Sequence, residues 1–220
     1  MRVRIKICGF RSPDEARFAA VGADAVGAVV GVPRSPRNLG LERAAELFAA
    51  VPAGVLRVAV TVSPDPRVIR DILGLGPDVL QLHLELPPRG WGEVRAVVGE
   101  RALIWGLLGM REGEPEEDLL RRARALRGAP LDGVVLDTVA RGRAGGTGTA
   151  HDWGRSRLAR DILYPTPVVL AGGLTSENVA AAIRAVEPDW VDVSSGVEEG
   201  GRKSPAKIAR FVEAVRHAAE

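Results

Sequence analysis

The chain has 220 residues, of which 46% are hydrophobic and 26% charged, and its formal net charge is +2. This balance fits one globular domain over residues 1–220, and its composition, without a dense basic run interleaved with aromatic residues, argues against nucleic-acid binding. Charges interrupt the first apolar stretch, no apolar run is long enough to span a bilayer, and there is a single cysteine, so we expect a cytoplasmic protein without membrane contact.

The first element expected in chain order is a strand over residues 3–7, where apolar and charged residues alternate. The strand leads into Cys8, the only cysteine, and Gly9 then breaks the pattern. Ser12 suits a helix N-cap, with Pro13 at the first helical position. A thiol at the carboxyl end of a strand lies where α/β enzymes hold catalytic groups. A cysteine packed as a small apolar residue is the alternative.

A repeat organises the rest of the chain. An aspartate precedes or begins an apolar run at four places, 54, 54 and 57 residues apart: Asp24, Asp78, Asp132 and Asp189. Four further apolar runs alternate with these, and stretches with helical periodicity, such as residues 41–48, lie between them. Eight strand–helix units in 220 residues predict an α/β fold, a single (β/α)8 TIM barrel. An open doubly wound sheet is the alternative.

Polar residues end several of these strands. In a TIM barrel, the carboxyl ends of the strands form the active-site face. Asp137 ends the sixth strand after four nonpolar residues, a position that suits a general acid, although an aspartate that caps a loop would look the same. Cys8 and Asp137 are expected on opposite sides of the barrel mouth, where they can act on two faces of one small substrate.

Two further side chains are candidates for substrate binding. Arg37, in the loop after the second strand, offers a planar fork for a carboxylate or a phosphate; a solvated surface charge is the alternative. His83 ends the fourth strand, where a histidine with a purely structural hydrogen bond is the alternative. Neither His151 nor His217 has metal-ligand spacing with His83, so no metal site is expected.

Glycine turns follow the seventh and eighth strands. Gly172 and Gly173 lead into a helix, and Ser195 and Gly196 form the second turn. Backbone amides at such turns bind phosphate, and TIM barrels frequently hold phosphate after these two strands. The pair therefore predicts a small phosphorylated substrate. A third glycine-rich segment, which includes Gly146, lies in a long loop and is either a lid or a plain connector.

In this order, the landmarks resemble the phosphoribosylanthranilate isomerase family of tryptophan biosynthesis. They are found at residues 6–9, 35–37, 81–83, 136–138, 145–148, 152–153, 170–174, 177–179 and 191–198. The resemblance implies an Amadori rearrangement of N-(5-phosphoribosyl)anthranilate to 1-(2-carboxyphenylamino)-1-deoxyribulose 5-phosphate, without a metal or cofactor. The chain departs from the family pattern at Val32, Leu84, His151 and Ser204.

The resemblance also implies residue roles. Asp137 would be the general acid that opens the ribose ring, and Cys8, as thiolate, would be the general base at C2′. Arg37 would hold the anthranilate carboxylate. The remaining substrate-binding residues expected from the loops and turns are His83, Gly146, Gly172, Gly173, Ser195 and Gly196.

Three questions stay open at the level of sequence. One alternative is a related sugar isomerase of the histidine pathway, whose chemistry resembles the action of a pair of aspartates at strands one and six; Cys8 at strand one argues against it. A non-enzymatic barrel scaffold is the other alternative. A monomer and a homodimer are both compatible with the chain. Finally, an ordinary thiol, with a pKa of about 8.5, is mostly protonated at neutral pH. Lys6 shares the inward strand face with Cys8, but the sequence does not give the distance between them.

Overall fold

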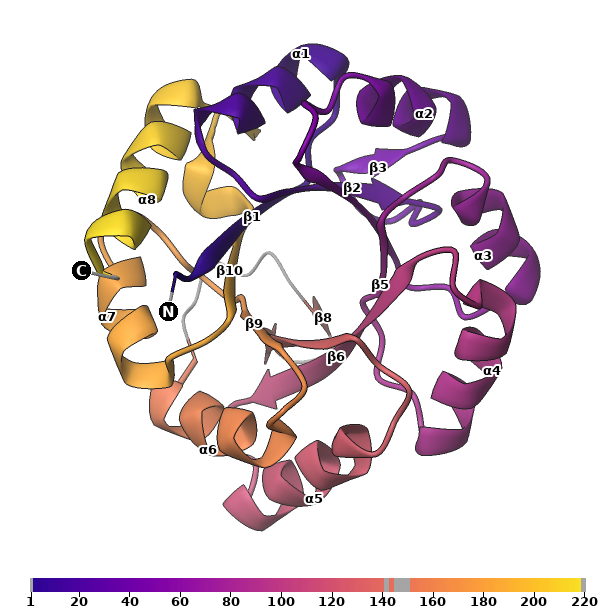
Figure 1. Cartoon of the computed structure of the whole chain (residues 1–220). Coiled ribbons are helices and arrows are strands. Elements are labelled where there is room, and N and C mark those ends of the chain that lie inside the picture. Colours follow the sequence, from indigo (N-terminus) through magenta and orange to yellow (C-terminus); the bar gives the residue numbers. More distant parts are fainter. Residues whose placement is uncertain (1, 141–142, 145–150, 219–220) are drawn as a thin grey trace.

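The computed structural model describes residues 2–140, 143–144 and 151–218. Within these residues, parallel strands close into a barrel with helices around it (Figure 1). β1 pairs with both β2 and β10, and this double pairing closes the ring. The barrel strands are β1 (Arg4–Cys8), β2 (Ala25–Val30), β4 (Leu56–Thr61), β5 (Val79–Leu82), β6 (Leu103–Arg111), β7 (Gly133–Ala140), β9 (Val168–Leu170) and β10 (Trp190–Val193).

Helices follow the strands and cover the outside of the barrel (Figure 1). They are α1 (Pro13–Ala16), η1 (Arg17–Val21), α2 (Leu41–Ala49), α3 (Pro66–Leu73), α4 (Pro88–Val98), α5 (Glu116–Arg127), α6 (Trp153–Leu163), α7 (Val179–Val186) and α8 (Pro205–Ala218). The short elements are β3 (Asn38–Leu39), β8 (Arg143–Ala144), η2 (Ser195–Val197), β11 (Glu198–Glu199) and β12 (Arg202–Lys203). The TIM barrel is thus confirmed, and the open sheet is excluded.

The predicted helix start after the first strand is correct. Pro13 occupies the first helical position, and the Ser12 hydroxyl accepts a hydrogen bond from the Glu15 amide at 3.3 Å. The α-helix is nevertheless only four residues long and continues as the 3₁₀ helix η1.

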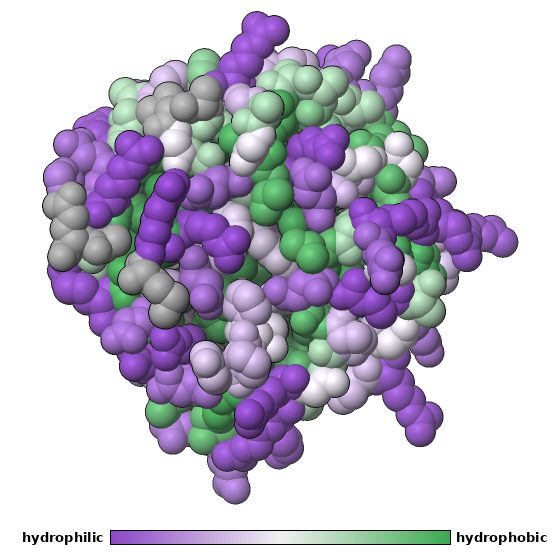
Figure 2. Space-filling model, viewed as in Figure 1, coloured by the Kyte–Doolittle hydropathy of each residue, from purple (hydrophilic) through white to green (hydrophobic). Residues whose placement is uncertain are grey.

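The surface seen from the same side as in Figure 1 is mixed. Long hydrophilic side chains project around the molecule, and hydrophobic residues lie between them in small groups (Figure 2).

A separate apolar cluster fills the barrel interior. Trp105 and Trp190 meet edge to face with ring centroids 5.2 Å apart. Small and branched residues from the other strands complete the cluster: Ala25, Val58, Val60, Val79, Val135, Val169 and Ala171. Since this cluster occupies the interior, the barrel is a packed core rather than a pore, and a substrate site belongs at its mouth.

The four repeated aspartates tie the strands together where they begin. Each carboxylate accepts a hydrogen bond of 2.8 Å from a backbone amide in the first two residues of the preceding barrel strand. The pairs are Asp24 with Ile5, Asp78 with Arg57, Asp132 with Ile104 and Asp189 with Val168. The repeat in the sequence is therefore a repeated structural bond at the amino-terminal face, opposite the expected active-site face.

Candidate active site

The residues predicted to carry chemistry lie at the carboxyl ends of the barrel strands. Cys8 ends β1 and Asp137 lies near the end of β7. On one side of the ring only β9 and β10 separate these strands, so the two residues are not diametrically opposed. His83 directly follows β5, and both glycine turns follow β9 and β10. Gly146 lies outside the described residues.

A buried ion pair lies beside Cys8. Lys6 is completely buried, and its Nζ lies 2.6 Å from Oδ2 of Asp192, the residue level with it on β10. Gly27 stands opposite Cys8 on β2, where a Cβ would lie 2.9 Å from the Cys8 Sγ. The absence of a side chain on Gly27 leaves the room that the thiol and the lysine stem occupy.

Burial and charge oppose each other in this group. Burial raises the pKa of the Cys8 thiol, and Lys6 and Lys203 act against it without cancelling it. Burial also raises the pKa of Asp192, although Lys6 pulls it down. For Lys6, the anionic partners outweigh the effect of burial and raise its pKa, so the ammonium form is strongly favoured.

Asp137 has a histidine partner. His83 Nε2 lies 3.3 Å from the buried Asp137 carboxylate, and the other ring nitrogen of His83 lies 3.2 Å from Gln81 Nε2. The sequence left the contact of His83 open, and the structure places it beside Asp137. Two buried acceptor atoms in this layer, Asp192 Oδ1 and Gln81 Oε1, have no hydrogen-bond partner among the described residues. A buried acceptor without a hydrogen bond carries a cost in free energy.

His151 contacts Thr138, the residue that follows Asp137 on β7. Its Nδ1 lies 3.0 Å from Thr138 Oγ1, and its Nε2 lies 2.5 Å from the hydroxyl of the buried Ser156 on α6. Burial lowers the pKa of His151, although the negative charges of Asp137 and Asp152 act against this effect. The neutral ring therefore links the end of β7 to α6.

Arg37 is held by a carboxylate of the chain itself. Its Nε and Nη2 donate to the two carboxylate oxygens of Glu198 at 2.8 and 2.7 Å. Lys203 donates to the same carboxylate at 2.8 Å and to the Ser194 carbonyl at 3.0 Å. Glu198 occupies one edge of the guanidinium, which leaves the edge formed by Nη1 and Nη2 for a second carboxylate.

The two glycine turns touch each other. Gly172 and Gly173 have φ angles of +86° and +64°, which favour glycine. A Cβ at Gly196 would collide with the carbonyl oxygen of Leu174, which follows the first turn. The Asn178 side chain braces the first turn, because its amide donates to the Gly173 carbonyl at 2.9 Å. The turns after β9 and β10 thus form one continuous backbone surface.

Several residues of this site were not among the predicted site residues, among them Asp192, Glu198 and Lys203. Asp192 and Glu198 lie in the segment 191–198, which carried part of the family resemblance. Asp192 is a charged residue between Val191 and Val193 in a buried strand, and this is a signal that could have been used.

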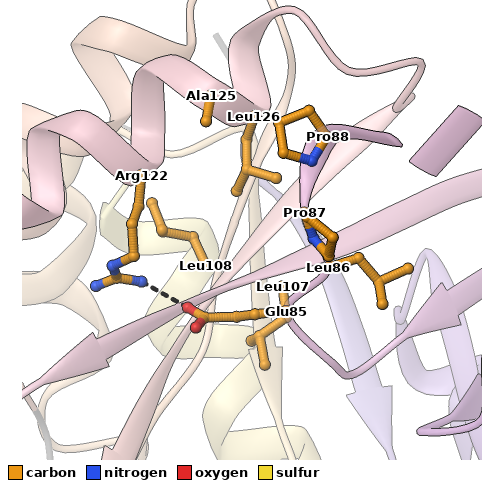
Figure 3. A pocket seen from close by; sticks show the side chains of 9 residues that line it. All are labelled: Glu85, Leu86, Pro87, Pro88, Leu107, Leu108, Arg122, Ala125 and Leu126. Carbon is orange, nitrogen blue, oxygen red and sulfur yellow. Dashed lines mark hydrogen bonds and ion pairs between the residues drawn. The ribbon is translucent and has the colours of Figure 1, made fainter. Parts of the chain in front are cut away.

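A cavity of about 300 Å³ lies between α5, β6, the start of α4 and the segment 85–87 that precedes it (Figure 3). Leucine and proline side chains dominate its lining, with an ion pair of 2.5 Å between Glu85 and Arg122 at one side. None of the predicted site residues lines it.

The comparisons with known proteins point to one family. Residues 5–214 match the family described as N-(5'phosphoribosyl)anthranilate (PRA) isomerase. The N-(5'-phosphoribosyl)anthranilate isomerase of Haloferax volcanii is 42% identical over 225 residues, which cover 98% of this chain and 94% of the relative. The chain belongs to the PRA isomerase family.

Solved structures of PRA isomerases share the fold. Monomers of the dimeric Thermotoga maritima isomerase superpose with a TM-score of 0.80 at 35% identity, covering 98% of this chain and 99% of theirs. A PRA isomerase in complex with reduced 1-(o-carboxyphenylamino)-1-deoxyribulose 5-phosphate gives a TM-score of 0.78 at 34% identity, again over 98% and 99% of the two chains. The predicted resemblance is confirmed, and with it the assignment to an isomerase of tryptophan biosynthesis.

Among the described residues, no helix combines the length and apolar character that crossing a membrane requires.

Proposed function

We propose that this PRA isomerase catalyses the Amadori rearrangement of N-(5-phosphoribosyl)anthranilate, with Asp137 as general acid and Cys8 as general base. The observation that supports this proposal most directly is the arrangement of residues at the barrel mouth. A buried carboxyl near the end of β7 and a partly buried thiol at the end of β1 lie on strands that only β9 and β10 separate on one side of the ring, and the paired glycine turns follow these same two strands. A small phosphorylated sugar bound at the turns would lie within reach of both groups.

The acid step opens the ribose ring. Asp137 in its protonated form gives its proton to the ring oxygen O4′, the C1′–O4′ bond breaks, and the nitrogen lone pair forms the C1′=N bond. His83, at 3.3 Å, is placed to donate a hydrogen bond to the carboxylate that results. This leaves a protonated Schiff base and an ionised Asp137.

The base step moves the double bond. The Cys8 thiolate takes the proton from C2′, and the C2′–H electron pair forms C1′=C2′ while the nitrogen becomes a neutral amine. Return of one proton to C1′ and loss of the proton on O2′ give the ketone. A thiol that gives up its proton and a carboxylate that accepts one restore both groups, so the net reaction is an isomerisation.

Binding groups surround these two residues. The edge of Arg37 that Glu198 leaves open suits the anthranilate carboxylate, since a guanidinium can hold two carboxylates in bidentate pairs. The turns at Gly172, Gly173, Ser195 and Gly196 offer backbone amides to the phosphate. We place the reaction in the cytoplasm, in a monomer or a homodimer.

Steady-state turnover, followed as loss of substrate fluorescence, tests the two roles. We expect Cys8→Ser and Asp137→Asn each to lose about a hundredfold or more in kcat, the scale of positioned acid–base groups. Both changes keep the size of the side chain, so circular dichroism should show an intact fold. Asp71→Asn, on the exposed side of α3, is the control and keeps full activity. An inactive wild type, or a fully active Cys8→Ser, would refute the assignment.

A further inference from the structure

The thiol of Cys8 needs a source of stabilisation for its charged form. Burial favours the neutral thiol, while a general base has to be a thiolate. The charged groups that face the thiol come from three parts of the fold. Lys6 lies on its own strand, Asp192 on β10, and Lys203 and Arg37 come from the loops next to the mouth. The neighbouring strand β2 presents Gly27, which carries no charge.

Geometry singles out Lys6 among these cations. A Cβ on Gly27 would lie 2.9 Å from the thiol Sγ and 3.2 Å from the Cε of Lys6, so both side chains border the same space. Each of the three cations is paired with a carboxylate, Lys203 and Arg37 with Glu198 and Lys6 with Asp192, so the difference between them is their position relative to the thiol. Lys6 has no exposed surface, so water does not screen its charge. Lys6 is thus the cation on the thiol's own strand whose side chain borders the same space over Gly27, and its charge acts on the thiol more strongly than that of Lys203.

Asp192 explains why a lysine can be charged at this depth. Burial disfavours the ammonium form of Lys6, and the 2.6 Å bond to Asp192 together with the charge of the Cys8 thiolate offsets this effect, so the thiolate remains as a partner where Asp192 is removed. Asp192 in turn lies near Asp137 and His83, whose charges act on it from β7 and from the end of β5. The pair Lys6–Asp192 therefore stands between the two groups that the proposed mechanism uses.

We propose that Lys6, held in place by Asp192, is the cation that stabilises the Cys8 thiolate, and that this buried pair sets the fraction of Cys8 available as a base. Lys6 is a positioning residue in this account, because it acts through Cys8. The inference rests on the proposed function only for the use of the thiolate; the stabilisation itself is a property of the free protein.

The two members of the pair act on the thiol with opposite signs. The positive charge of Lys6 favours the thiolate. The negative charge of Asp192 disfavours the thiolate and also partly neutralises the charge of Lys6. Lys6→Met should therefore raise the thiol pKa, and Asp192→Asn should lower it. A pair with a merely structural role predicts no such opposition, because loss of either member would disturb the same packing.

The experiment measures the thiol pKa from the rate of alkylation by iodoacetamide as a function of pH. Cys8 is the only cysteine of the chain, so the rate reports on this one thiol. For Lys6→Met we expect a drop in the alkylation rate at pH 7 of about tenfold or more, since one pKa unit changes the thiolate fraction tenfold. For Asp192→Asn we expect a rise. Arg4→Gln removes a positive charge from the other end of β1 and serves as the matched control, with an unchanged rate.

A second variant covers the case that Lys6→Met does not fold because it leaves Asp192 buried and unpaired. Lys6→Met/Asp192→Leu replaces the whole pair by apolar side chains, and its thiol pKa should exceed that of the wild type, because Lys6 affects the thiol more than Asp192 does. A thiol pKa that stays at the wild-type value in the variants that lack Lys6 overturns the inference. Shifts of the same sign in Lys6→Met and Asp192→Asn also overturn it.

Turnover of the same variants separates this inference from the proposed function. If Cys8 is the base, kcat/KM at pH 7 falls in Lys6→Met in parallel with the alkylation rate. If the alkylation rate falls and kcat/KM does not, the role of Cys8 as base is wrong while the stabilisation of its thiolate by Lys6 stands.

Discussion

The side chain of His151 connects several elements at the barrel mouth. Its ring accepts or donates hydrogen bonds at Thr138 on β7 and at Ser156 on α6, and it lies against the turn at Gly172. The ring of His151 thus connects β7, the strand that carries Asp137, with α6.

We predict that His151→Phe lowers the free energy of unfolding by about 1–3 kcal/mol, because it leaves the hydroxyl of the buried Ser156 without its partner. Burial lowers the pKa of His151, so the unfolded chain takes up the proton first as the pH falls. The stabilisation is therefore complete above pH of about 6.5 and is lost as the pH falls towards the lower pKa of the folded state. Urea unfolding at pH 8 and pH 5.5 measures both effects.

Ser156→Ala provides the control for this prediction. In a Ser156→Ala background no hydroxyl is left unpaired, so His151→Phe should cost less there than in the wild type. An equal cost in both backgrounds, or a cost that grows on acidification, contradicts the proposed bonding of His151.

Cys8, Asp137 and the glycine turns could be predicted because each follows a strand, and the barrel topology brings all strand ends to one face. The partners of these residues could not be predicted in the same way. Lys6 meets Asp192 because β1 and β10 are staggered so that the two residues are level, and local sequence patterns do not encode that stagger. Arg37 meets Glu198 through two loops that are 161 residues apart in the chain.

At the scale of elements, the ends of β9 and β10 work as one unit. Gly196 approaches the carbonyl of Leu174 so closely that any side chain at this position would push the two turns apart. The sequence predicted two separate phosphate turns, each with its own glycine. The structure shows that the two turns are in contact where Gly196 meets the carbonyl of Leu174.

We predict that Gly196→Ala raises KM by about tenfold or more and leaves kcat nearly unchanged. A charge-assisted hydrogen bond to phosphate is worth about 1.5–3 kcal/mol, and about 1.4 kcal/mol corresponds to a factor of ten in affinity. Steady-state kinetics measures the two constants. Gly128→Ala, at the end of α5 with open space around its Cα, is the matched control and should leave both constants unchanged. A loss in kcat alone would argue against phosphate binding by these turns.

For the whole molecule, the barrel separates stability from chemistry by face. The proposed catalytic groups lie at the carboxyl ends of the strands, and the four repeated aspartates bond the amino-terminal ends. The fold could be read from the sequence because this repeat recurs at a nearly constant spacing and because buried parallel strands are continuous apolar runs. What the aspartates do could not be read, since a carboxylate before a strand looks the same whether it binds a ligand or a backbone amide.

The separation of the two faces predicts the effect of Asp24→Ala. Asp24 accepts a hydrogen bond of 2.8 Å from the amide of the buried Ile5, on the strand that closes the barrel by pairing on both sides. Its removal should lower the free energy of unfolding by about 1–3 kcal/mol, because the amide loses a charged acceptor. At the same time kcat/KM should stay at the wild-type value, since the bond lies at the end of β1 opposite to Cys8.

Denaturant unfolding and steady-state kinetics on the same preparation test both halves of this prediction. Asp14→Ala is the control, because this carboxylate is largely exposed on α1 and pairs only with the equally exposed Arg17, a surface bond that contributes about 0–1 kcal/mol. A fall in kcat/KM with unchanged stability would mean that the amino-terminal face communicates with the mouth through β1. A fall in stability alone means that the closure of the barrel and the chemistry at its mouth can be altered independently.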